Sequence, residues 1–130
     1  DTDNRNCAAF LAELNALVAV SAPALTVLIR LAIEEIEAWY LGDKHALLRA
    51  YPTARQRQDK LKRYKQDSIC GTWELLADII YPEGATGLKR DKTVGSKKYE
   101  WAENIAPLLE PERNLSPSFR KFCAGIRRLV

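Results

Sequence analysis

Hydrophobic residues recur at helical spacing along most of the chain, separated by short polar breaks. In the segment 6–20, Phe10, Leu14, Leu17 and Val18 fall on one face of a helix. Similar spacing, bounded by proline, glycine and capping residues, indicates helices in several other segments. These predicted helices cover residues 34–41, 44–50, 54–65, 72–81, 96–109 and 117 to the end.

One segment has a different pattern. Residues 26–33, Thr-Val-Leu-Ile-Arg-Leu-Ala-Ile, are apolar, rich in β-branched side chains and as long as a typical strand. A buried strand needs partners for its backbone N–H and C=O groups. These would be strands upstream of residue 1 or another copy of the chain, so a homo-oligomer is one expectation. The pattern favours an α/β, helix-rich domain.

Local charge is more informative than overall composition. With 130 residues, 47% of them hydrophobic, the chain can form a single domain with one core, and its net charge of +3 indicates no particular partner. Residues 44–65 contain eight basic residues against one acid, and residues 86–98 contain five against one. A separate acidic segment follows residue 33. This distribution fits a chain that holds a polyanion and a metal ion at different places.

The cysteines exclude two classes of site. Cys7, Cys70 and Cys123 are far apart, and the chain has one histidine. A structural zinc site needs about four Cys or His ligands, and scattered thiols suit a reducing cytoplasm better than a disulfide framework. No apolar run approaches the roughly 20 residues that span a bilayer, and no signal peptide is visible. A cytoplasmic protein with no membrane partner is expected.

Acidic residues near the start of the chain predict a metal site. Asp1 and Asp3 form a DxD pair, and Glu34, Glu35 and Glu37 form a second carboxylate group. This is the layout of a site for Mg²⁺ (or Mn²⁺) in phosphate chemistry, because these ions take oxygen ligands and usually one or two carboxylates directly. Alternatively, the aspartates are acids favoured by the dipole of the first helix.

The three glutamates are candidate catalytic residues because of their position. They follow the predicted strand, and ligands in open α/β sheets gather at the carboxyl ends of strands. Glu34 and Glu37 are three residues apart and share one helix face, so they could complete a two-metal site. The alternative is that the glutamates are ordinary acids in the first turn of a helix.

Several strings in the chain resemble a known bacterial family, domain of unknown function 4276. In order along the sequence they are Asp1-Thr-Asp-Asn-Arg5, Ala32-Ile-Glu-Glu-Ile-Glu-Ala-Trp-Tyr-Leu-Gly-Asp43, Gln66-Asp-Ser-Ile-Cys-Gly-Thr-Trp-Glu-Leu-Leu-Ala-Asp78, Trp101-Ala-Glu-Asn-Ile-Ala-Pro107 and Ser116-Pro-Ser-Phe-Arg120. The resemblance implies a TOPRIM-like parallel sheet domain, of which this chain would be the C-terminal part. Residues 1–43 would then form the metal-site core region and residues 44–130 a C-terminal helical region.

The same resemblance implies roles for particular residues. Asp1 and Asp3 match the DxD that holds magnesium in TOPRIM domains, whereas the glutamate motif that precedes it there has no counterpart in this chain. Lys98 matches a lysine position of the family and could neutralise charge that builds on a phosphate during the reaction. A lysine on a helix surface is the alternative interpretation of Lys98.

The basic segment after Thr53 is a candidate nucleic-acid interface. Thr53 and Gln56 have the spacing of a capping box, which predicts a helix there. Its cations could neutralise backbone phosphates, although no array of aromatic residues indicates base stacking. A solvated helix is the alternative. The candidate nucleic-acid-binding residues are Arg55, Arg57, Lys60, Lys62, Arg63 and Lys65.

Two shorter signals concern helix starts. The loop Asp67–Thr72 precedes a helix whose backbone amides could receive a phosphate, although Ser68 or Thr72 could equally cap that helix. Ser116-Pro117 is typical of a helix start, with Ser116 as the N-cap.

Two functions fit these observations. The first is a Mg²⁺-dependent, phosphodiester-cleaving, nuclease-type protein acting on nucleic acid, with a role in phage defence by analogy with OLD-type nucleases. The nuclease activity is extrapolated from proteins of related fold, and a fold by itself does not imply a function. The alternative is a non-catalytic helical binding or adaptor module that docks on a partner such as an ATPase.

Overall fold

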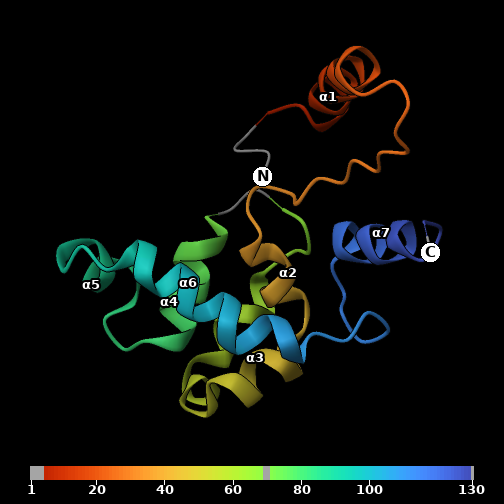
Figure 1. Ribbon diagram of the computed structural model, residues 1–130. Coiled ribbons are helices and arrows are strands. Elements are labelled where there is room, and N and C mark those ends of the chain that lie inside the picture. Colours follow the sequence, from red (N-terminus) through yellow and green to blue (C-terminus); the bar gives the residue numbers. More distant parts are fainter. Residues whose placement is uncertain (1–4, 69–70, 130) are drawn as a thin grey trace.

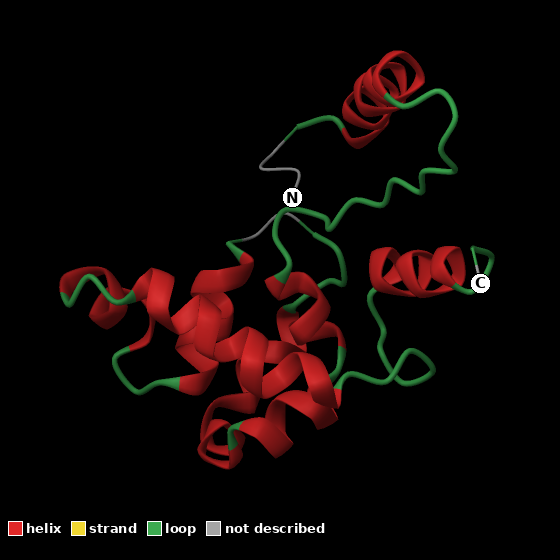
Figure 2. Ribbon diagram, in the orientation of Figure 1, coloured by secondary structure: helices red, strands yellow, loops and turns green. Residues whose placement is uncertain are grey.

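The computed structural model describes residues 5–68 and 71–129, and this part of the chain is helical (Figures 1 and 2). Short loops join most of the helices. The α-helices are α1 (Cys7–Ser21), α2 (Glu37–Gly42), α3 (Lys44–Ala50), α4 (Thr72–Ile80), α5 (Gly84–Arg90), α6 (Val94–Ile105) and α7 (Pro117–Ile126), and the 3₁₀ helices are η1 (Pro52–Arg63) and η2 (Ala106–Leu108).

The predicted strand and the parallel sheet are wrong. The described residues contain no strand, so an α/β fold with a TOPRIM-like sheet is not what this chain forms. Residues 26–32 are extended, yet none of the backbone–backbone hydrogen bonds of the described chain involves them. Their composition suits a strand, but a strand forms only where another strand supplies partners for its backbone. Without that strand, the described residues give no reason to expect a homo-oligomer.

The main core forms where α2, α3, α4 and α6 meet. Its largest fully buried side chains include Trp101 from α6 and Ile79 from α4. α2 is buried along its whole length, while α3, α4 and α6 each turn apolar side chains to this core. Burying a large apolar side chain contributes roughly 2 kcal/mol. The predicted periodicity of these four helices is confirmed, with bounds that differ by up to a few residues.

The predicted basic helix is present in a tighter form. η1 begins at Pro52, and Tyr51 precedes it without a side-chain cap, so the capping box expected from Thr53 and Gln56 does not form. Twelve residues are long for a 3₁₀ helix. Arg57 attaches η1 to the core by donating hydrogen bonds to the carbonyls of Ile79 and Ile80 at the end of α4.

A network of buried polar groups attaches α7 to α2. Ser116 caps α7 by accepting a hydrogen bond from the amide of Phe119, as predicted. Its hydroxyl donates to Asp67 at 2.6 Å, and Asp67 also accepts from the amide of Ser118. The Ser118 hydroxyl in turn accepts from Trp39 Nε1 on α2 at 2.8 Å. Ser116 is therefore a structural residue.

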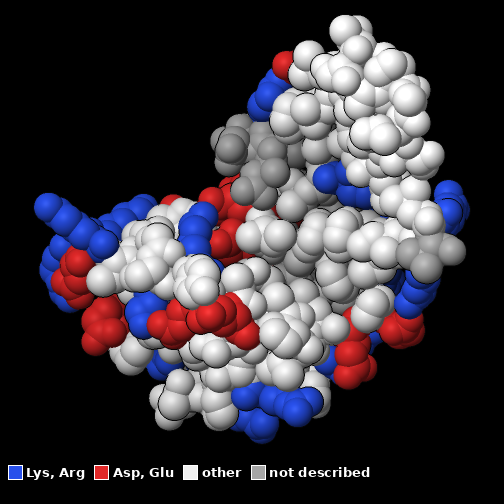
Figure 3. Space-filling view, viewed as in Figure 1, with Lys and Arg blue, Asp and Glu red and all other residues white. Residues whose placement is uncertain are grey.

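The first helix stands apart from this body. α1 forms over nearly the predicted residues and is capped by Asn6, but none of its residues is buried. In Figure 1 it projects from the rest of the chain at the end of the extended segment. The face of α1 seen in Figure 3 is mostly uncharged, and Glu13 is the one charged residue of the helix. A helix that is apolar all round is normally covered by other parts of a protein.

Candidate functional site

The structure brings together the four predicted catalytic residues. Glu34 and Glu35 lie in the turn before α2, Glu37 is the first residue of α2, and Lys98 comes from α6. Lys98 Nζ lies 2.6 Å from Glu35 Oε1 and 3.6 Å from Glu37 Oε1. We call these four residues the acid–lysine cluster. Helices far apart in the sequence therefore meet at this point.

Glu34 occupies the N-terminus of α4. Its carboxylate accepts hydrogen bonds from the amides of Gly71 and Thr72, at 2.8 and 3.0 Å. The amides predicted to receive a phosphate thus bind a carboxylate of the chain itself, which the helix dipole favours. Neither Ser68 nor Thr72 caps this helix. The N-cap residue is Gly71, which has no side chain that could form a cap.

The backbone of Glu34 is in a strained conformation. Its φ is 62°, in the left-handed region that residues other than glycine rarely adopt. Such a conformation costs on the order of 1 kcal/mol and persists only where the surrounding structure holds it. In this chain the turn aims the Glu34 carboxylate at α4 and leaves Glu35 facing Lys98.

The two carboxylates beside Lys98 have different environments. Glu37 is only 2% exposed, and its burial raises the pKa of its carboxyl; the charge of Glu35 raises it further, while Lys98 opposes the shift. The Glu35 side chain is 17% exposed, and it also accepts a hydrogen bond from the Thr72 hydroxyl at 3.4 Å. Carboxyl groups whose environments differ in this way can divide acid and base roles between them.

Lys98 is charged and partly open to solvent. Burial alone would lower the pKa of its ammonium group, but the hydrogen bond to Glu35 and the charges of Glu37 and Glu35 raise it overall. Its side chain is 33% exposed, and its ammonium lies 5.7 Å from the centre of the Trp73 ring. The ammonium charge of Lys98 therefore lies at the surface, next to two carboxylates and an aromatic ring.

Burial of Glu37 predicts a pH dependence of stability. Because its folded pKa lies above the ordinary value of 4.5, the folded chain binds this proton more tightly than the unfolded chain does. The free energy of unfolding should therefore fall as pH rises from about 4.5 through the folded pKa. In Glu37→Gln this fall should be smaller, as measured by urea denaturation at a series of pH values. Glu103→Gln, an exposed change on α6, should keep the wild-type slope, and an unchanged slope in Glu37→Gln would contradict the assignment.

Two carboxylates of the cluster converge on Lys98. Glu35 and Glu37 already share one positive charge, that of Lys98. Mg²⁺ commonly takes one or two carboxylates and completes its shell with waters and substrate phosphates. Binding would require the partly exposed Lys98 to move aside. Within residues 5–68 and 71–129 no group of three His, Cys, Asp or Glu side chains could hold a metal ion, and the predicted ligands Asp1 and Asp3 lie outside these ranges.

Sequence reasoning missed two neighbours of the cluster. Thr72 was expected only as a cap, and its hydroxyl donates to Glu35 instead. Trp73 had no expected role, and its ring lies near Lys98. Both are in the string Gln66–Asp78, which is one of the segments that carry the family resemblance. That resemblance was the available signal for their position.

The six candidate nucleic-acid-binding residues divide into two groups. Arg57 turns inward to the end of α4, Lys60 lies 3.5 Å from Asp78, and Lys62 lies 2.5 Å from Asp59. No side-chain partner is found among the described residues for the other three, which are Arg55, Arg63 and Lys65. The second group is free to contact a polyanion.

No described helix combines the length and the apolar character needed to cross a bilayer.

Comparison of the chain with protein families, curated proteins and solved structures finds no match. The resemblance to domain of unknown function 4276 therefore stays a prediction.

Proposed function

We propose that this chain contributes the acid–lysine cluster to a Mg²⁺-dependent enzyme that cleaves phosphodiester bonds in nucleic acid. The observation that supports the proposal is the placement of Lys98 against Glu35 and Glu37, at 2.6 and 3.6 Å, across 63 and 61 positions of sequence. An ammonium group flanked by two carboxylates can contact a phosphate while the carboxylates bind a cation. Chemistry of this kind depends mainly on positioning and charge.

Each residue of the cluster has a separate task in this proposal. Glu35 and Glu37 would hold the ion, which supplies an activated water and stabilises charge on the phosphate oxygens. Lys98, released from Glu35, would face a phosphate oxygen of the substrate and neutralise its charge. Glu34 keeps the turn in place through its hydrogen bonds to Gly71 and Thr72, so its role is to position the other three.

The test is a pair of measurements on the whole chain. Calorimetric titration with Mn²⁺ should show binding, and a labelled oligonucleotide should be cut with Mg²⁺ or Mn²⁺ present and stay intact with EDTA. The double variant Asp1→Ala/Asp3→Ala tests the predicted DxD ligands in the same assays. A well-folded chain that binds no ion and cuts no oligonucleotide would refute the proposal.

A second candidate, the binding or adaptor module, is supported by α1. This helix has no buried residue, and Leu17 and Val20 on it are exposed, as is Leu25 just after it. Such a helix offers an apolar surface to a partner. The module explanation would replace the first proposal if a folded chain neither bound metal nor cleaved nucleic acid.

A further inference from the structure

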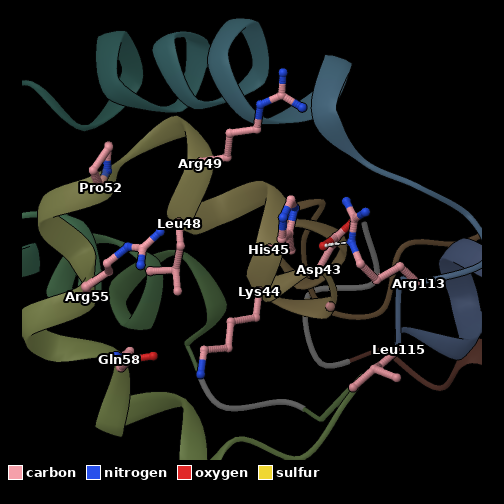
Figure 4. A pocket seen from close by; sticks show the side chains of 11 residues that line it. Asp43, Lys44, His45, Leu48, Arg49, Pro52, Arg55, Gln58, Arg113 and Leu115 are labelled. Carbon is pink, nitrogen blue, oxygen red and sulfur yellow. Dashed lines mark hydrogen bonds and ion pairs between the residues drawn. The ribbon is translucent and has the colours of Figure 1, made fainter.

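A basic cavity lies between α3 and η1 (Figure 4), and its lining includes no residue of the acid–lysine cluster. Its volume is about 790 Å³. Figure 4 shows Lys44 from α3 and Arg55 from η1 extending toward the space between the two helices, with Leu48 and Gln58 beside them. The residues that line it are Gly42, Asp43, Lys44, His45, Leu48, Arg49, Pro52, Arg55, Gln58, Arg113 and Leu115.

The cavity has an excess of positive charge that the chain itself does not neutralise. Its one carboxylate, Asp43, is engaged by Arg113 in two hydrogen bonds of 2.8 Å. The remaining cations of the lining are Lys44, Arg49 and Arg55. Asp59 acts on Lys44 electrostatically from outside the lining, but it is itself paired with Lys62 at 2.5 Å. Arg49 and Arg55 have no side-chain partner among the described residues.

The lining specifies phosphate rather than base recognition. Lysine and arginine side chains neutralise backbone phosphates, and arginine can contact two oxygens of one phosphate. No Phe, Tyr or Trp lines the cavity, and His45 is its one aromatic ring, so it offers little surface on which bases could stack. An anion held here would be recognised by its charge and oxygen atoms.

The cavity and the acid–lysine cluster are at opposite ends of α2. Glu37 is the first residue of this helix, and Gly42 and Asp43 at its other end line the cavity. Six residues of helix rise about 9 Å. One polyanionic strand is long enough to contact both places.

We propose that the α3–η1 cavity binds the phosphate backbone of a nucleic-acid strand and so holds the substrate beside the acid–lysine cluster. This inference rests on the proposed function for the identity of the substrate. Binding by the cavity needs neither metal nor cleavage, so the two proposals can fail separately.

The test measures binding of a labelled single-stranded oligonucleotide to the whole chain by fluorescence anisotropy, with EDTA present. Lys44→Gln/Arg55→Gln should weaken binding about tenfold at low salt and reduce the slope of log K against log salt by about 1.4, since each phosphate contact on a single strand contributes about 0.7. The control is Lys121→Gln/Arg128→Gln, which removes the same charge from exposed positions at the end of the chain. Its affinity should stay within about twofold of wild type, because a remote charge acts only through a screened field.

Three results would overturn the inference. They are the absence of binding by the folded wild-type chain, an equal loss of affinity in both double variants, and displacement of the oligonucleotide by an equal concentration of inorganic pyrophosphate. The last result would assign the cavity to a small phosphate ligand. Strand binding that depends on Lys44 and Arg55 in a chain that never cleaves would support the cavity and refute the proposed enzyme.

Discussion

Replacing Glu35 by glutamine should lower the rate of Mg²⁺-dependent phosphodiester cleavage by about a hundredfold or more, the range seen when one electrostatic element of an active site is removed. Glutamine has the shape of glutamate and can still accept a hydrogen bond from the Thr72 hydroxyl. It removes the negative charge that lies 2.6 Å from Lys98 Nζ and would hold the ion. The measurement is the single-turnover cleavage rate of a labelled oligonucleotide at saturating Mg²⁺.

Two further variants make this result specific. Glu103→Gln removes the same charge from an exposed position of α6 and should leave the rate unchanged. Lys98→Gln should also slow cleavage, and its loss should be most evident in the rate constant because a charge on the reacting phosphate is stabilised mainly in the transition state. Full activity in Glu35→Gln, in a chain shown to be folded by circular dichroism, would remove this residue from the site.

The helices could be predicted from the sequence because their signals are local. Ser116 caps α7, and Pro117 takes the first helical position, as the two residues indicate in the sequence. The attachment of η1 to the core could not be predicted in the same way. It depends on Arg57, whose guanidinium donates hydrogen bonds to carbonyls at the end of α4 that are 22 and 23 residues away.

The predicted strand did not form, because strand formation depends on partners elsewhere in the structure and not on local signals alone. The composition of residues 26–33 reports only that the segment suits a pleated, half-buried surface. Whether it forms a strand depends on neighbours, and in the described chain no other strand is present to pair with it. Val27 is 44% exposed as a result. The helices of the core depend less on such partners, since most backbone hydrogen bonds of a helix lie within it.

The candidate site was partly predictable. The acidic residues 34–37 stand out by composition, and Lys98 by the family resemblance, but their contact joins residues 63 apart. The raised pKa of Glu37 depends on its burial, which the sequence does not report. The α3–η1 cavity was not predicted, because its excess positive charge depends on the pairing of Asp43 with Arg113, which is 70 residues away.

Replacing Asp43 by alanine should lower the free energy of unfolding by about 3 kcal/mol, which combines the loss of a helix N-cap with the loss of a buried, charge-assisted pair. Asp43 is 1% exposed and accepts four hydrogen bonds. Two come from Arg113, at 2.8 Å each, and two from the amides of Ala46 and Glu110, at 3.0 and 3.1 Å. One side chain thus joins the start of α3 to the segment that leads to α7. Urea denaturation at pH 7 measures the change.

The stabilisation by Asp43 should disappear in acid. Burial alone would raise the pKa of this carboxyl, but the hydrogen bonds from Arg113 and from the two amides lower it below the ordinary value of 3.8. The folded chain therefore binds this proton less tightly than the unfolded chain does. The difference between wild type and Asp43→Ala should be full above about pH 5 and should shrink as pH falls below 3.8 toward the folded pKa. Asp59→Ala, at an exposed aspartate, should match wild type at pH 7. A difference between wild type and Asp43→Ala that stayed constant into acid would show that the carboxylate charge is not what stabilises this junction.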